Sequence, residues 1–442
     1  MLDFGRSDDP RVQKQLDRLA RLSVPQGRLG LDTIRALMER LGNPHRNLPP
    51  VFHVAGTNGK GSVCAFLRAM LEADGKRVHV TTSPHLVRYN ERIRLAGKLI
   101  EDDALASLLE EVLDTGPDLH PSFFEVTIAA AFLAFGRTPA DACVVEVGLG
   151  GRFDATNVLE PEAVAVCGIA ALGIDHERFL LAPEDNVPKE PLARIAFEKA
   201  GIAKKGVPLV TLGDTYPEDS RQSIRDVAKR IGAPLSERGE HWVSSAADGG
   251  RLHLLEYRDP QAEGDFPVPS IPGRHQAANA ALAIAMLRAQ DAVRVSPDAI
   301  RSGLRAASWP ARLQTLGEGP LAASCSAPKV LLDGGHNRSA GEAIADALPD
   351  DPRSIHLVLG MLDTKDPHAI VEPLGERVRS LTVVPVPGHD SHPPEAFGDD
   401  TLAAGDLTQA LQSLPPDGYP VLIAGSLYLA GEALRLNDEI PD

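Results

Sequence analysis

The chain has 442 residues, 43% of them hydrophobic, and at about 100–200 residues per domain this length predicts two or three domains with sizeable cores. Its formal net charge of −16 argues against nucleic-acid binding through a basic surface. No apolar run approaches the ~18 residues that cross a membrane. From the net charge we expect no nucleic-acid partner, and from the lack of a long apolar run we expect no membrane contact.

The first half of the chain alternates between helix-like and strand-like segments. A helical pattern covers residues 11–41 and ends before Pro49-Pro50. Continuous apolar runs then predict strands at residues 51–55, 78–82, 142–147 and 163–169, with helices at residues 63–74, 102–114 and 123–135. Strands that are apolar at nearly every position indicate a sheet covered on both faces, so we expect a doubly wound, mostly parallel sheet.

A second strand–helix pattern follows two helices at residues 277–288 and 298–307. It predicts strands at residues 330–333, 356–359, 383–386 and 421–424, and a helix at residues 339–348. Residues 240–272, which are rich in Pro and Gly, indicate a β excursion. We place a domain boundary near residue 307, which gives a first domain of residues 1–307 and a second of residues 308–442.

The strongest motif is Gly56-Thr57-Asn58-Gly59-Lys60-Gly61-Ser62, which follows a predicted strand and opens a helix. Glycines let the backbone wrap a phosphate, while N–H groups and the helix N-terminus supply positive potential. Lys60 adds a full charge near the β- and γ-phosphates. The fold class is therefore α/β, with a P-loop doubly wound mostly parallel sheet domain followed by a smaller Rossmann-like α/β domain.

One position departs from the usual phosphate loop. The residue after the loop lysine is normally Ser or Thr, whose hydroxyl binds Mg²⁺, but here it is Gly61. The hydroxyl could come from Ser62 or from Ser83, which lies just past the second predicted strand. Ligands of open α/β sheets bind beyond the carboxyl ends of the strands, which favours Ser83.

Polar groups also follow the third and fourth predicted strands. Glu146 ends a strand otherwise made of Ala, Cys and Val, where a carboxylate must be paired or bind metal, and oxygen ligands suit Mg²⁺. Asp175-His176 follows the fourth strand. We expect Ser83, Glu146 and His176 to meet at one sheet edge. The plainer alternatives are a salt bridge for Glu146 and, for Lys199 near a helix end, a surface position.

These motifs together resemble the Mur ligase superfamily and, within it, the folylpolyglutamate synthase/dihydrofolate synthase family. The similarity extends over nearly the whole chain in the family's order. The matching stretches are the phosphate loop, Thr82-Ser83-Pro84-His85-Leu86, residues 90–93, Phe124-Glu125, residues 146–152, Asp154-Ala155-Thr156-Asn157, Asp175-His176, residues 198–202, His275-Gln276, Asn279-Ala280, and residues 309–313, 333–337 and 425–428.

The resemblance implies an ATP-dependent ligase that adds L-glutamate to dihydropteroate or reduced folates. ATP would convert the substrate carboxylate to an acyl phosphate, which the amine of glutamate attacks. The resemblance assigns catalysis to Lys60, His176, Lys199 and His336, two Mg²⁺ ions to Ser83, Glu146 and His176, and contacts with ATP or its site to the phosphate loop, Asn279, Arg312 and Asp333. It also implies a carbamylated Lys199.

A pterin pocket is a further expectation. The resemblance places Phe124, Arg152 and Asp154 at the substrate. A carboxylate such as Asp154 can accept hydrogen bonds from the N–H edge of a pterin, and a ring such as Phe124 can stack on its face. The plainer alternative is that Asp154 caps a turn and Phe124 fills core.

The chain departs from the family's pattern in three places. The loop between His176 and Lys199 is longer than the family's, residues 170–174 lack the usual Thr-Ser start, and Gly335 and Arg338 replace the usual Ala and Pro. These changes affect the expected amino-acid pocket.

Two other functions are less consistent with the sequence. A peptidoglycan-type Mur ligase would carry a UDP-sugar domain, for which we expect no room before Gly56. A P-loop nucleotide-binding switch module would need neither the 333–337 motif nor a second α/β domain. The four cysteines form no CxxC pair, and residues 1–10 show no secretory signal, so we expect a cytoplasmic protein, and the family suggests a monomer.

Overall fold

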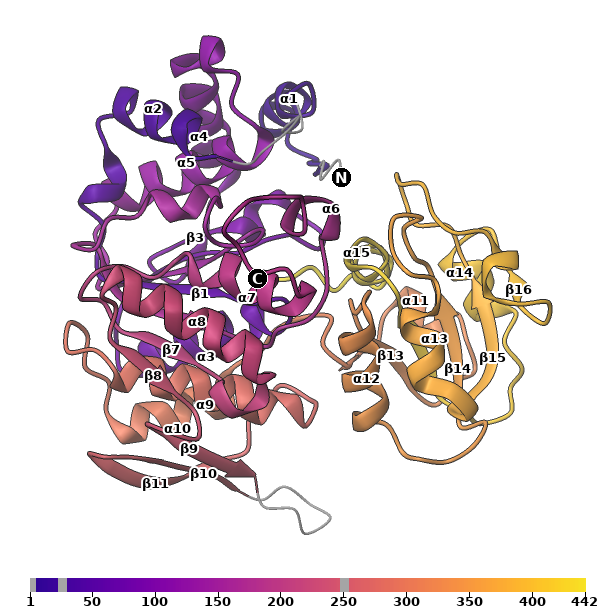
Figure 1. The fold of residues 1–442 in the computed structure, drawn as a ribbon. Coiled ribbons are helices and arrows are strands. Elements are labelled where there is room, and N and C mark those ends of the chain that lie inside the picture. Colours follow the sequence, from indigo (N-terminus) through magenta and orange to yellow (C-terminus); the bar gives the residue numbers. More distant parts are fainter. Residues whose placement is uncertain (1–4, 23–29, 247–253) are drawn as a thin grey trace. The chain divides into compact units, whose positions relative to one another are not determined.

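The computed structural model describes residues 5–22, 30–246 and 254–442. The chain divides into two compact units (Figure 1). The first comprises residues 1–84, 89–270 and 276–308, and the second comprises residues 85–88, 271–275 and 309–442. Within the described ranges, no helix is long and apolar enough to span a membrane.

The first unit is built on an eight-stranded sheet with the order β4-β3-β2-β5-β1-β6-β7-β8. Its strands are β1 (Val51–Ala55), β2 (Val78–Thr81), β3 (Ile93–Leu95), β4 (Lys98–Leu99), β5 (Ala142–Glu146), β6 (Val164–Ile169), β7 (Leu209–Thr211) and β8 (Leu235–Glu237). All neighbours from β2 to β8 pair in parallel, whereas β3 and β4 join antiparallel at one edge. The expected doubly wound, mostly parallel sheet is confirmed.

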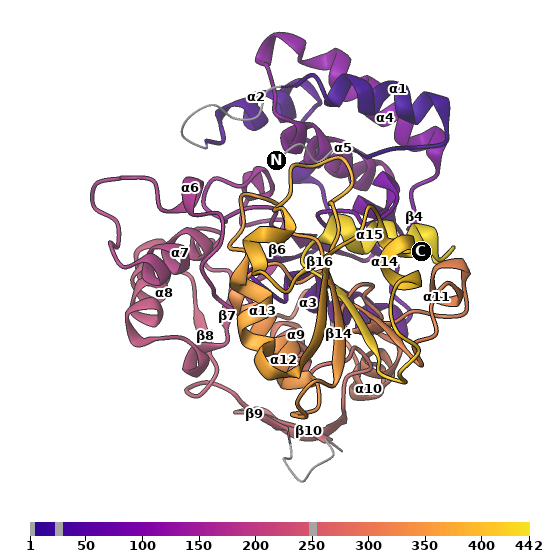
Figure 2. The same ribbon diagram turned by 90° about the vertical axis from the view of Figure 1, so that its right-hand side faces the viewer.

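Helices cover this sheet as the apolar patterns predict. They are α1 (Pro10–Leu19), α2 (Asp32–Arg40), α3 (Lys60–Ala73), α4 (Asp102–Thr115), α5 (Phe123–Arg137), α6 (Glu177–Leu180), α7 (Pro191–Ala200), α8 (Glu218–Ile231), α9 (His275–Arg288) and α10 (Pro297–Ala306). Helices α1, α2, α4 and α5 gather at one end of the unit in both views (Figures 1 and 2). Helix α5 begins at a capping box, in which Ser122 and Glu125 satisfy each other's backbone N–H groups.

Two expectations for this unit can be compared directly. The helical pattern over residues 11–41 forms two helices, α1 and α2, and part of the stretch between them lies outside the described residues. The β excursion is confirmed as an antiparallel sheet of β9 (Val243–Ala246), β10 (Leu254–Asp259) and β11 (Ala262–Pro267).

The second unit holds a six-stranded sheet with the order β12-β13-β17-β14-β15-β16. Its strands are β12 (Gln314–Thr315), β13 (Val330–Leu332), β14 (Ile355–Leu359), β15 (Val378–Val383), β16 (Leu402–Ala403) and β17 (Val421–Ala424). Its helices are α11 (Pro320–Ala323), α12 (Arg338–Ala347), α13 (His368–Leu374), α14 (Leu407–Gln412) and α15 (Leu427–Leu436).

Alternate strand residues divide the core of this unit into two layers. Leu331 and Leu422 face a layer with α12 and α13, whereas Leu332 and Ile423 face one with α11, α14 and α15 (Figure 2). This arrangement confirms a second α/β unit.

The strand expected at residues 383–386 was misplaced, because β15 ends at Val383. Pro385 has no N–H to donate to a ladder, so this apolar run could not be a strand inside the sheet. Strand β15 starts with partly exposed residues such as Arg379, so it does not form a continuous apolar run.

Candidate active site

The phosphate loop connects β1 to α3 with glycines at the two positions that demand them. Gly56 has φ +155° and Gly59, which precedes α3, has φ +83°, a left-handed conformation. A Cβ at Gly56 would lie 2.9 Å from the Cβ of Ala170, and one at Gly59 would lie 2.4 Å from Oδ1 of Asn279. The structure therefore places Asn279, on α9, directly against the loop.

Hydrogen bonds from the segment after β6 hold the loop in shape. The N–H groups of Thr57 and Asn58 donate to the carbonyl of Ala171 at 2.8 and 3.3 Å, and the Thr57 hydroxyl donates to the carbonyl of Gly173 at 2.8 Å. The Lys60 ammonium folds back onto the loop and donates to the carbonyls of Gly56 and Thr57 at 3.1 and 3.3 Å. The lysine charge thus lies within the curve of the loop.

The hydroxyl of Ser62 is an unsatisfied group beside this loop. The residue is 1% exposed, and its Oγ has no hydrogen-bond partner among the described residues. A buried hydroxyl needs a partner, so a phosphate oxygen or a cation at the loop fits this position. Ser62 therefore stays open as an oxygen donor alongside Ser83.

Strand order brings the predicted metal ligands to one edge. Strands β2, β5, β1 and β6 are consecutive parallel neighbours, and Ser83, Glu146, the phosphate loop and His176 follow their carboxyl ends. The backbone N–H of Ser83 donates to Oε2 of Glu146 at 3.2 Å, and Glu146 is 4% exposed. These two sequence-predicted residues are thus in direct contact.

His176 lies farther along the same edge, before α6. It has a left-handed backbone with φ +54°, and its Nε2 lies 4.0 Å from Oδ2 of Asp175. Across the described part of the chain, no group of three or more His, Cys, Asp or Glu side chains could hold a metal ion alone. A cation here would need hydroxyl and phosphate oxygens as well, which fits hard ions such as Mg²⁺.

Lys199 is buried near the end of α7 with 3% of its surface exposed. Burial and the nearby charge of Lys60 lower the pKa of Lys199 to about 7, against the opposing effect of Asp175, Asp154 and Glu198. The plainer alternative, a surface position for Lys199, is therefore excluded. Near neutral pH a large share of this amine is uncharged and nucleophilic.

Arg152 is taken up by carboxylates. Its Nη2 lies 2.6 Å from Oε2 of Glu184 and 2.8 Å from Oε1 of Glu198, and its guanidinium lies over the ring of Phe153 with 4.3 Å to the centroid. The guanidinium is thus already paired within the protein. Its contact with substrate stays a prediction.

Asp154 organises the loop after β5. It is 4% exposed, its Oδ1 accepts from the N–H of Thr156 at 2.9 Å, and its Oδ2 accepts from the N–H of Leu149 at 2.8 Å. Burial raises the pKa of Asp154, and these hydrogen bonds lower it. Both oxygens are engaged, which supports the turn-capping alternative over a pterin contact.

Phe124 lies at the same sheet edge. Its half-buried ring packs on Gly148, two residues beyond Glu146, where an added Cβ would lie 2.3 Å from Cζ of Phe124. The ring retains exposed surface on which a flat substrate could stack.

We expect Asp154→Ala to reduce glutamate addition to dihydropteroate and to folates by the same factor. The reason is that the carboxylate holds the loop that both reactions share. The two rates would be measured side by side on the purified variant. A much larger loss with dihydropteroate alone would show that Asp154 binds the pterin after all.

The second unit contains the other predicted site residues, with Arg312 just before β12 and Asp333 and His336 just after β13. Asp333 is 5% exposed, and its Oδ2 and Oδ1 accept from the N–H groups of Leu313 and Gly335 at 2.9 and 2.7 Å. Burial raises the pKa of Asp333, whereas the charge of Arg312 lowers it. The Nδ1 of His336 lies 3.0 Å from the carbonyl oxygen of Gly334. Asp333, Arg312 and His336 thus belong to one local constellation.

Tyr216 is a structural residue that was not predicted. Its hydroxyl lies 2.7 and 2.8 Å from the carbonyls of Ile169 and Ala170, so the loop after β7 is tied to the segment that supports the phosphate loop. No local pattern marks it, because a single Tyr-Pro after a three-residue strand is a common loop sequence.

No protein-family profile matches the chain. The dihydrofolate synthase/folylpolyglutamate synthase of Bacillus subtilis is 33% identical over 434 residues, which is 91% of this chain and 94% of that protein.

The chain belongs to the dihydrofolate synthase/folylpolyglutamate synthase family. Solved structures of this family match along the whole chain. Escherichia coli FolC in complex with DHPP and ADP superposes with a TM-score of 0.82 at 30% identity, covering 98% of each chain. A bifunctional folylpolyglutamate synthase/dihydrofolate synthase with Mn, AMPPNP and L-glutamate bound gives a TM-score of 0.81 at 30% identity, covering 98% of this chain and 99% of that one. Membership of this synthase family confirms the expected class of enzyme, an ATP-dependent ligase.

Proposed function

We propose that this protein uses ATP to join L-glutamate to dihydropteroate and to reduced folates, as a bifunctional dihydrofolate synthase/folylpolyglutamate synthase. The observation that carries the proposal is the sheet edge at which the phosphate loop, the Ser83–Glu146 contact and His176 meet. The relatives captured with DHPP and with L-glutamate support the choice of substrates.

The chemistry is a phosphoryl transfer followed by an acyl transfer. An oxygen of the substrate carboxylate attacks the γ-phosphorus of ATP, so that ADP leaves and an acyl phosphate forms. The amine of glutamate then attacks the acyl carbon, the carbon–oxygen bond to phosphate breaks, and a proton leaves the nitrogen. Lys60 and the N–H groups of the phosphate loop neutralise the charge that develops on the transferred phosphoryl group.

Ser83, Glu146 and His176 are the residues that would hold Mg²⁺, with the unsatisfied Ser62 hydroxyl as a further oxygen donor at the loop. When bound, Mg²⁺ supplies charge neutralisation of the phosphates. The Glu146 carboxylate contributes the full negative charge that such a site needs, because serine and histidine ligands are neutral.

We extend the proposal to the two units. Residues 1–307 would bind ATP, and residues 308–442 would form the glutamate-ligase domain, in which Arg312 and Asp333 contact the nucleotide and His336 acts in catalysis. Burial raises the pKa of Asp333 and the charge of Arg312 opposes this rise, which supports a shared site for these two residues. A monomer acting in the cytoplasm completes the proposal.

Lys199 is proposed to react with CO₂ as the neutral amine and to form a carbamate, which replaces a buried cation by an anion. The amine is mainly charged below a pH of about 7 and mainly neutral above it. We therefore expect turnover to fall as the pH drops below about 7, and to fall in CO₂-depleted buffer until bicarbonate is restored. A pH–rate profile with and without bicarbonate checks this. Turnover that ignores bicarbonate throughout would contradict the modification.

The substrates are tested by offering dihydropteroate and tetrahydrofolate separately, each with ATP and glutamate, and by detecting the glutamylated product by mass spectrometry. We expect product from both acids. Product from tetrahydrofolate alone would reduce the proposal to a folylpolyglutamate synthase, and product from neither would overturn it.

A further inference from the structure

Four charged side chains form a closed cluster beside Lys199, here called the arginine–glutamate cluster: Arg152, Glu184, Arg194 and Glu198. Arg152 contacts both carboxylates, as described above. The Nη2 of Arg194 lies 2.8 Å from Oε2 of Glu184 and 3.0 Å from Oε1 of Glu198. Arg194 and Glu198 side chains are each 6% exposed, so solvent and salt screen these pairs less than surface ion pairs.

Residues of the arginine–glutamate cluster and its neighbours pack closely against the last turn of α7, which carries Lys199. The N–H of Arg152 donates to the carbonyl of Glu198 at 2.8 Å. A Cβ at Gly151 would lie 3.0 Å from the Cα of Lys199, and one at Gly201 would lie 2.4 Å from the Cβ of Arg152. Backbone contact this close leaves little freedom between residues 151–152 and the end of the helix.

Residues 151–152 belong to the chain segment that follows β5. That segment starts at Glu146, the proposed metal ligand, and reaches Arg152 six residues later. Arg152 therefore connects the helix that carries Lys199 to the strand that carries Glu146. The guanidinium of Arg152 makes this connection through its ion pairs with the protein carboxylates described above.

Glu184 comes from the loop between α6 and α7. Its two oxygens contact both arginines, and Nε of Arg194 donates to the carbonyl of Leu180 at 3.1 Å. The loop and the end of α6 are thus each bonded to Arg194 of α7. Without Glu184, the two arginines would share the single carboxylate of Glu198.

We propose that Glu184 and Arg152 are positioning residues that hold the last turn of α7, and with it Lys199, in register with the Glu146 edge of the sheet. They act through Glu198 and the backbone of residues 151–152. The catalytic consequence rests on the proposed function, in which turnover depends on carbamylated Lys199.

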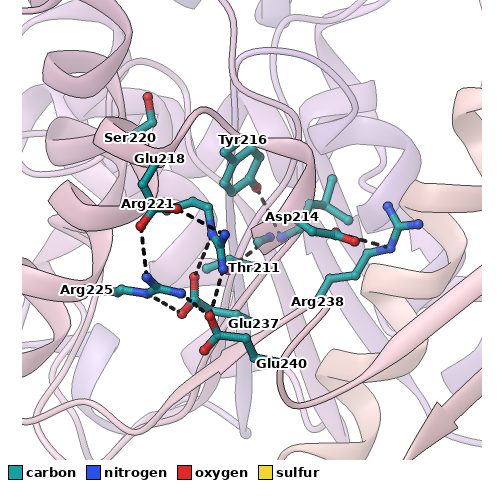
Figure 3. A network of polar contacts seen from close by, with 12 residues as sticks. Thr211, Asp214, Tyr216, Glu218, Ser220, Arg221, Arg225, Glu237, Arg238 and Glu240 are labelled. Atoms are coloured by element: carbon teal, nitrogen blue, oxygen red, sulfur yellow. Dashed lines mark hydrogen bonds and ion pairs between the residues drawn. The ribbon is translucent and has the colours of Figure 1, made fainter.

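The test compares Glu184→Gln with a matched control, Glu237→Gln. Both substitutions remove one charge and keep the shape. Like Glu184, Glu237 contacts two arginines, Arg225 at 2.7 Å and Arg221 at 3.7 Å (Figure 3), and it is the more buried of the two glutamates, at 2% exposed. Its network joins β8 to α8 and makes no ion pair with the arginine–glutamate cluster among the described residues.

The first readout is hydrogen–deuterium exchange of the backbone amides of residues 198–203, which needs no activity. We expect exchange there to rise severalfold in Glu184→Gln and to stay at the wild-type rate in Glu237→Gln. The second readout is kinetic. Misplacement of a catalytic group lowers the rate steeply, so we expect kcat about tenfold lower in Glu184→Gln, with KM for ATP within about twofold, and Glu184→Asp to recover most of the loss.

Unchanged exchange at residues 198–203 in Glu184→Gln would overturn the proposal. So would faster exchange with an unchanged kcat, or an equal fall of kcat in the Glu237→Gln control. A wild-type protein that forms no glutamylated product would instead contradict the proposed function, and the exchange comparison would still decide whether Glu184 holds the helix end.

Discussion

Lys60→Ala should abolish turnover while the protein stays folded. The Lys60 ammonium donates to two loop carbonyls, at 3.1 and 3.3 Å, and pairs with no carboxylate among the described residues, so its removal leaves no unpaired buried charge. In the reaction the same charge would stabilise the transferred phosphoryl group, and loss of one such contact costs about 100-fold or more. Steady-state ADP release with dihydropteroate and glutamate measures the effect, and circular dichroism monitors the fold.

Lys76→Ala is the matched control for this experiment. Lys76 follows the end of α3, the helix that Lys60 opens, and pairs with Asp74 at 3.2 Å near the surface. The control should keep wild-type activity. If Lys60→Ala retained more than about a tenth of the wild-type rate, the assignment of the phosphate loop would be wrong.

Glu146→Gln should be the most damaging change among the proposed metal ligands. The substitution keeps the shape and the backbone contact with Ser83 but removes the full charge that Ser83 and His176 lack. We expect a loss of about 100-fold or more in Mg²⁺-dependent turnover, with milder losses for Ser83→Ala and His176→Ala. Titration of activity against Mg²⁺ separates weaker metal binding from a slower reaction.

Glu160→Gln, which removes a surface partner of Arg46, serves as the control and should leave turnover unchanged. The comparison also resolves the role of Ser62. If Ser62→Ala abolished activity and Ser83→Ala had no effect, the hydroxyl ligand of the metal would be Ser62. The hydroxyl of Ser62 has no hydrogen-bond partner among the described residues. Glu146→Gln with wild-type Mg²⁺ dependence would remove the metal site from this edge.

The sheet edge could be predicted from sequence because strands covered on both faces are continuous apolar runs. β1 and β5 are buried along their whole length, and the glycine Gly56 after β1 and the charged Glu146 at the end of β5 mark where these strands end. Once the strands are parallel neighbours, their carboxyl ends must meet. Strand β7, which has three residues, was missed because so short a run carries too little signal.

Pairings between distant charged residues could not be predicted. Arg152 and Glu184 are 32 positions apart, and nothing in either local sequence shows that they meet. Likewise, the sequence around Asp154 does not show that its two oxygens accept hydrogen bonds from Leu149 and Thr156. Residues 85–88 belong to the second unit although they directly follow β2, a return that depends on packing far along the chain.

The most direct test of the central claim follows an oxygen atom. Dihydropteroate labelled with ¹⁸O in its carboxylate would be supplied with ATP and glutamate, and the released phosphate would be analysed by mass spectrometry. If the carboxylate is activated as an acyl phosphate, each turnover transfers one labelled oxygen to phosphate. Phosphate that forms with the glutamylated product but carries no label would contradict the account.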